Sequence, residues 1–108
     1  MVDKNIPLIL AQKTQQKDIH LDENGFFVIE IQNNFIVVEY YSNVYKEKKI
    51  VSGTLEKVFK GKKADELSDT IAAHVPNLLI THYLYLGREL QKAQIALENN
   101  KKYIQGGC

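Results

Sequence analysis

The sequence predicts an α+β domain, with a three- to four-stranded, mainly antiparallel sheet and two C-terminal helices on one of its faces. Three observations lead to this class. Runs of β-branched and aromatic residues alternate with a period of two between residues 25 and 61. Apolar residues then recur every three or four positions, and Pro76 divides this second region into two segments. Strands followed by helices are typical of helices gathered on one face of an antiparallel sheet.

The first two strands are expected to form a hairpin through Asn33 and Asn34. FFVIEIQ precedes this pair and FIVVEYY follows it, and asparagine tolerates the positive φ that a two-residue loop requires. Such a loop pairs Ile31 with Ile36, Ile29 with Val38 and Phe27 with Tyr40, which gives an apolar face for the core. The opposite face mixes apolar residues with Glu30 and Glu39, so we expect a partner chain to cover it.

The third strand and the two helices follow in order. The strand lies within KIVSGTLEKVFKG, residues 49–61, and the first helix within residues 62–75. Ala64, Leu67, Ile71 and Val75 fall on one face of that helix. The last helix is expected over residues 77–98, and residues 103–105 either add a short strand or lie over the core.

Length and composition predict one domain, residues 20–105, between an N-terminal arm or connection (1–19) and a mobile tail (106–108). The lone Cys108 excludes an internal disulfide or a thiolate metal cluster. A formal net charge of +1 gives no global field for nucleic acid or anionic lipid. No apolar run reaches the roughly 20 residues that span a bilayer. We therefore expect a cytoplasmic protein that does not enter membranes or bind bulk nucleic acid.

The candidate site lies in the last helix, HYLYLGRELQKAQIAL, residues 82–97. At about 100° per residue, His82 and Glu89 share the central apolar stripe and Arg88 stands at its edge. A buried carboxylate needs a partner. The candidates are Lys57, Lys62, Lys63, His82, or Arg88 of a neighbouring chain. The three residues form either a binding or catalytic site or a structural polar network, for example across a dimer interface.

A second apolar stripe on this helix contains Ile80, Leu84, Gly87 and Ile95. A helix that is apolar on two sides is buried on two sides, here against the sheet and against either the first helix or a second subunit. Gly87 costs about 1 kcal/mol relative to alanine. Close approach of a backbone or ligand would justify that cost, and a packing notch is the alternative.

Further candidate ligand contacts are Tyr85, Gly87, Lys62 and Lys63. The two lysines follow the third strand in KGKK, where a helix N-terminus favours anions; a solvated basic turn is the alternative. The spacing of histidines and carboxylates indicates no metal site, and no cofactor is identified.

Several segments together resemble a known, uncharacterised domain family: HLDENGFFVIEI, IVVEYY, FKGKKADEL, HYLYLGRELQKAQIAL and KKYIQ. The family contains small stand-alone proteins of cyanobacteria and archaea. It also forms a C-terminal domain in archaeal dihydropteroate-synthase-related proteins, and some members are named after tetrahydromethanopterin methyltransferase subunits. The resemblance implies an α+β domain associated with pterin or one-carbon metabolism, without an established reaction. Thr81 and Gly106 stand where the family usually has aspartates, so an Asp–His pairing does not carry over.

Three functions are compatible with these patterns. The first is a small homodimeric domain that binds an anionic nucleotide- or pterin-like ligand. The second is an enzyme for a phosphoryl or phosphodiester substrate, with His82 as general acid or base, Arg88 stabilising negative charge and Glu89 orienting groups. The third is a non-catalytic oligomerisation or partner-binding domain.

Overall fold

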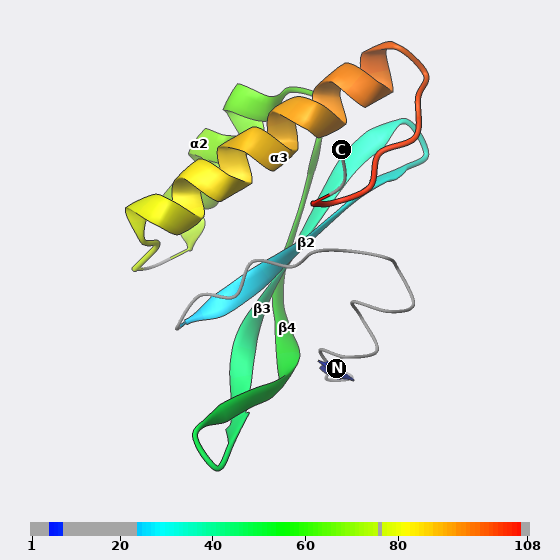
Figure 1. The fold of residues 1–108 in the computed structure, drawn as a ribbon. Coiled ribbons are helices and arrows are strands. Elements are labelled where there is room, and N and C mark those ends of the chain that lie inside the picture. The colour runs from blue at the N-terminus through cyan, green and yellow to red at the C-terminus, as the bar shows by residue number, and fades with distance from the viewer. Residues whose placement is uncertain (1–4, 8–23, 76, 107–108) are drawn as a thin grey trace.

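The structure, a computed structural model, describes residues 5–7, 24–75 and 77–106. Its strands are β1 (Asn5–Pro7), β2 (Gly25–Gln32), β3 (Phe35–Lys46) and β4 (Lys49–Gly61), and its helices are α2 (Ala64–His74) and α3 (Ile80–Glu98). The strands form one antiparallel sheet in the order β1-β4-β3-β2. Both helices lie against the same face of this sheet (Figure 1). The predicted α+β architecture is therefore confirmed. Most of the predicted N-terminal arm, and Cys108, lie outside the described residues.

The β2–β3 hairpin has the predicted register. Ile31 pairs with Ile36, Ile29 with Val38 and Phe27 with Tyr40. Asn33 and Asn34 have φ values of 52° and 65°, as the two-residue loop requires. A second tight turn joins β3 to β4, and there Glu47 and Lys48 also have positive φ, 54° and 66°. Asparagine tolerates this backbone better than glutamate or lysine does.

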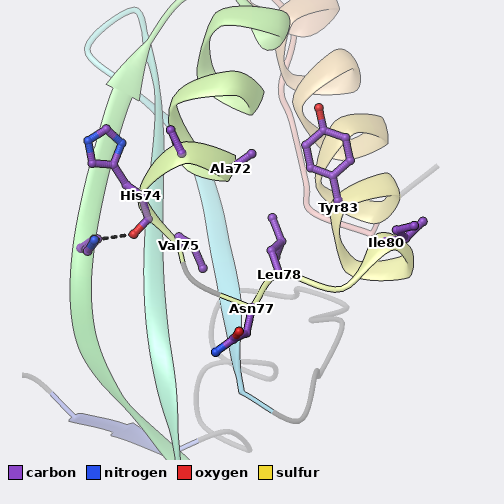
Figure 2. A pocket seen from close by; sticks show the side chains of 9 residues that line it. Ala72, His74, Val75, Asn77, Leu78, Ile80 and Tyr83 are labelled. Carbon is purple, nitrogen blue, oxygen red and sulfur yellow. Dashed lines mark hydrogen bonds between the residues drawn. The ribbon is translucent and has the colours of Figure 1, made fainter.

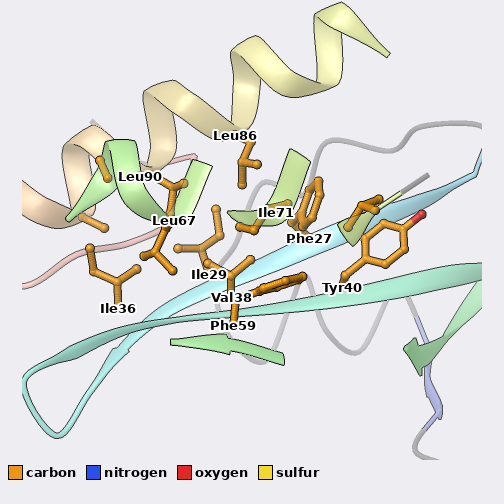
Figure 3. Packing of buried hydrophobic residues seen from close by; sticks show 13 residues of the cluster. Phe27, Ile29, Ile36, Val38, Tyr40, Phe59, Leu67, Ile71, Leu86 and Leu90 are labelled. Carbon is orange, nitrogen blue, oxygen red and sulfur yellow. The ribbon is translucent and has the colours of Figure 1, made fainter. Parts of the chain in front are cut away.

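The main core fills the space between the sheet and the helices (Figure 3). The strands contribute Phe27, Ile29, Ile36, Val38, Tyr40 and Phe59, and the helices contribute Ala64, Leu67, Ile71, Leu86, Leu90 and Ala93. Of the predicted hairpin face, all but Ile31 belong to this core, and Ile31 is half-buried. All four residues of the predicted helix face belong to it, since Val75 also packs there. The apolar side chains that alternate along the strands thus pack against those that recur every three or four residues along the helices.

The second face of the sheet carries a smaller cluster, Phe26, Val28 and Tyr41. The Phe26 and Tyr41 rings are stacked with centroids 5.2 Å apart. A Cβ at Gly53 would lie 2.4 Å from the Phe26 ring, so glycine is required there. All three are already buried within the single chain, so they do not need the partner chain that was expected to cover this face.

The last helix begins at Ile80 rather than at residue 77. Asn77 has a φ of 58° and Leu79 has extended backbone, and neither conformation continues an α-helix. Within the described residues, neither helix combines the length and apolarity needed to cross a bilayer.

Candidate functional site

His82 and Glu89 lie on the inner side of α3, as the apolar stripe predicts. His82 is 1% exposed, and its ring centroid is 4.7 Å from that of Phe27 on β2 and 6.2 Å from that of Tyr85. Tyr85 is also buried. The imidazole therefore packs among aromatic rings between the helix and the sheet.

Glu89 is buried but fully engaged in interactions. Its Oε1 accepts hydrogen bonds from the Tyr103 hydroxyl at 2.8 Å and the Gly106 amide at 3.0 Å. Its Oε2 lies 2.9 Å from the Lys92 ammonium. Burial, and then the hydrogen bond to Glu89, raises the pKa of the Tyr103 phenol above its ordinary value. The partners of Glu89 therefore differ from those expected from the sequence. They are Lys92, one turn away on α3, and two residues of the C-terminal segment, Tyr103 and Gly106.

The C-terminal segment attaches to the sheet through Gln105, which is 1% exposed. The Gln105 amide oxygen accepts from the Ile29 amide at 2.8 Å, and its nitrogen donates to the Phe27 carbonyl at 2.9 Å. The same nitrogen donates to the Tyr85 hydroxyl at 2.7 Å. A neighbouring parallel strand would satisfy the same two backbone groups of β2. Of the two alternatives for residues 103–105, the short strand does not form, and one side chain takes its place. The other alternative holds, since Tyr103 packs against the core.

Gly87 and Arg88 lie on the outer side of α3, which faces away from the sheet. A shallow depression of about 520 Å³ surrounds Gly87. It is lined by Ser68 of α2 and by Tyr83, Leu84, Gly87, Arg88, Gln91 and Lys92 of α3. Within the described part of the chain, a Cβ at Gly87 would have no atom within 4 Å other than those of its chain neighbours and of the α3 backbone. Packing within this chain therefore does not require glycine at this position.

Lys62 and Lys63 lie at one end of the helix layer, between β4 and α2. The Lys62 ammonium lies 4.9 Å from the centroid of the Phe35 ring, and that of Lys60 lies 4.5 Å from it. Lys63 is 3.7 Å from Glu98 at the C-terminus of α3. A crevice of about 320 Å³ adjoins Lys62 and Lys63. Both lysines are exposed.

A further hollow, of about 720 Å³, lies beside the turn between α2 and α3 (Figure 2). Its walls are mostly apolar, with Ala72, Val75, Leu78 and Ile80 among them. The Lys57 ammonium at its edge donates to the His74 carbonyl, so this cation binds the end of α2. Tyr83 lines both this hollow and the depression at Gly87.

The predicted site residues thus occupy three locations. His82, Tyr85 and Glu89 are buried against the sheet, Gly87 and Arg88 face outward, and Lys62 and Lys63 lie beyond the helix ends. Lys92 connects the first two locations, since it contacts Glu89 and lines the depression. Sequence reasoning missed Lys92, Tyr103 and Gln105. The three-residue spacing of Glu89 and Lys92, which places them on adjacent turns, was the available signal for the lysine.

Comparison with known proteins places this fold in a family. Residues 21–106 match the model of the PterinBD-DUF4346 domain. The chain belongs to the PterinBD-DUF4346 family. This confirms the resemblance based on the sequence motifs. The matched part of the domain includes Glu89 and each of its partners, Lys92, Tyr103 and Gly106.

Two relatives differ in how much of their own length this chain matches. A Ycf91-like protein of Nostoc sp. is 30% identical over 116 residues, which cover 89% of this chain and 91% of that protein. An uncharacterised protein of Methanocaldococcus jannaschii is 39% identical over 104 residues, which cover 94% of this chain but 18% of that protein. No solved structure matches the chain.

Proposed function

We propose that this PterinBD-DUF4346 domain binds a small anionic heterocycle, of the pterin or nucleotide kind, in the depression at Gly87. The observation that carries this proposal is the open space over Gly87: apart from its chain neighbours and the backbone of α3, no atom of the described residues lies within 4 Å of a Cβ there. A glycine in a helix interior costs stability, and here no internal contact repays that cost. A flat molecule lying on the bare helix backbone would do so.

The side chains around the depression suit such a ligand. Arg88 offers a planar fork of donors that can bind a carboxylate or phosphate through two hydrogen bonds. Gln91 and Ser68 provide amide and hydroxyl groups for the polar edge of a ring, and Tyr83 and Leu84 provide apolar surface. The volume of about 520 Å³ is ordinary for a small-molecule site. The family name adds support for a pterin as the ring system.

The geometry favours binding over catalysis by His82, Arg88 and Glu89. A catalytic base must reach the substrate that the arginine holds. His82 instead packs on Phe27 at the inner side of α3, whereas Arg88 lines the outer depression. We assign Glu89 a positioning role: its contact with Lys92 holds a second cation at the rim.

Isothermal titration at low protein concentration tests this proposal, with pterin-6-carboxylate, folate and GMP as probes. At least one probe should bind the wild type, and Arg88→Gln should weaken binding about tenfold or more, because a charge-assisted hydrogen bond is lost. Lys63→Gln is the matched control, since it removes an exposed cation outside the depression. Absence of binding by all three probes contradicts the proposal. So does a larger loss in Lys63→Gln than in Arg88→Gln, which would place the anion at the turn before α2.

A further inference from the structure

The outer side of α3 exposes three large aliphatic residues. Ile80 is 76% exposed, Leu84 54% and Ile95 55%. At about 100° per residue they fall within roughly 60° of one another, so they form one line along the helix. This line is the second apolar stripe predicted from the sequence, and the first helix does not cover it. Large apolar side chains exposed on one face of a helix are typical of an interaction site.

The two isoleucines at the ends of the stripe are placed symmetrically about a point between Gly87 and Arg88. Ile80 and Ile95 lie equally far from that point, and so do Leu84 and Gln91. Two copies of α3 placed antiparallel across a two-fold axis therefore pair Ile80 with Ile95 and Leu84 with Gln91. A two-fold interface uses the same surface patch on both copies. In this register the stripe of one copy faces the stripe of the other.

We propose that a second copy of this chain docks on the outer side of α3, antiparallel, with the two-fold axis between Gly87 and Arg88. In this register Arg88 of the second copy lies over Gly87, where the missing side chain leaves the depression. Glycine lets helices approach closely, and the long arginine side chain fills the remaining space.

The charges of the helix layer favour a second copy over other partners. The exposed side of α2 carries Asp65 and Asp69, whereas that of α3 carries Arg88 and Lys92. Glu66 instead lines a crevice against β4. Ser68 of α2 borders the depression. Asp65 and Asp69 are exposed within one turn of Ser68 along α2, so an arginine entering over Gly87 would approach them. Each copy therefore presents Arg88 on α3 and carboxylates on α2, and Arg88 of one copy would meet the carboxylates of the other.

This docking covers the depression to which we assigned the anionic heterocycle, so ligand and second copy exclude one another. This part of the inference rests on the proposed function; the helix pairing does not. Each copy must release its ligand before two copies pair. A ligand at about ten times its Kd should then weaken self-association roughly a hundredfold, because the effect applies to both copies. The ligand would act as the signal that separates the subunits.

Disulfide trapping tests the pairing, in a Cys108→Ser background. Chains carrying Ile80→Cys alone and Ile95→Cys alone are mixed and oxidised. The antiparallel register predicts covalent dimers in the mixture but not in either variant by itself, since identical positions lie about 22 Å apart along the helix axis. Dimers in the single variants, or none in the mixture, overturn the proposed register.

Sedimentation tests the docking face and its link to the ligand. Leu84→Glu should make the chain monomeric, while Val58→Glu, at a residue of similar exposure on β4, should leave self-association unchanged. An unchanged dimer in Leu84→Glu overturns the docking face. The best probe from titration should shift wild type toward monomer. If it binds yet strengthens or spares the dimer, the exclusion is wrong. If no probe binds, the proposed function fails, while trapping still decides the pairing.

Discussion

The Glu89 carboxylate accepts a hydrogen bond from the Tyr103 hydroxyl across 2.8 Å and so fastens the C-terminal segment to α3. The Gly106 amide binds the same oxygen, and Lys92 binds the other. One buried carboxylate therefore holds the chain end on one side and a cation at the rim of the depression on the other.

Replacing Glu89 by glutamine should lower the free energy of unfolding by about 1–3 kcal/mol, because charge-assisted bonds to buried donors are lost. Urea denaturation at pH 7 measures this. Glu98→Gln is the control: its pair with Lys63 is exposed, so the change should stay within about 0.5 kcal/mol. Equal losses in the two variants would contradict the role given to Glu89.

Stability should fall at alkaline pH through Tyr103. Its pKa is raised in the folded chain, mainly by burial, so its contribution is fully present below the unfolded pKa of about 10. That contribution is lost as the pH rises toward the folded value. Urea midpoints between pH 8 and 11 should therefore decline less steeply in Tyr103→Phe than in wild type. Tyr41, whose pKa is also raised, remains in both chains, so parallel curves would refute this assignment.

Gln105→Leu should destabilise the domain by about 2–4 kcal/mol, because it leaves two buried backbone groups of β2 without their partner. Amide exchange measured by NMR should become faster at Ile29, whose N–H loses its acceptor. Gln105→Glu separates the two contacts, since a carboxylate can accept from Ile29 but cannot donate to Phe27. Unchanged exchange at Ile29 in the leucine variant would show that the bond contributes little.

Gly87→Ala should stabilise the isolated chain by about 1 kcal/mol, because the helix gains propensity and the added methyl group meets open space. The same change should weaken self-association, because the methyl group occupies the notch. Thermal unfolding of the monomeric Leu84→Glu chain, with and without Gly87→Ala, gives the first quantity. A destabilising effect there would mean that the space over Gly87 is smaller than the structure indicates.

The sequence predicts most of the fold because the spacing of apolar residues within a short segment already indicates a strand or a helix and its buried face. The hairpin register follows from Asn33, Asn34 and the alternation around them, and the buried face of α2 follows from spacing alone. The start of α3 was misplaced because Asn77 and Leu79 adopt backbone conformations that apolar spacing does not indicate. The face that contains Phe26 was expected to be covered by a partner chain, because alternation along two strands does not show that one chain can bury Phe26, Val28 and Tyr41 by itself.

The candidate site was less predictable because it depends on contacts between distant segments. A helical projection places His82 and Glu89 together, yet it cannot show that Gln105 and Tyr103 return from the chain end to meet this face. It also placed Arg88 near the same stripe, while the structure turns it to the outer depression. Lys92 could have been found from its spacing to Glu89.

The turn between β3 and β4 offers a practical advantage. Glu47 and Lys48 hold a backbone conformation that Asn-Gly adopts at lower cost, at a tip that borders none of the hollows on the helix layer. Installing Asn-Gly there would add thermal tolerance without altering the helices. Such a reinforced parent chain would keep otherwise fragile α3 variants folded, so that losses of affinity could be told apart from losses of structure.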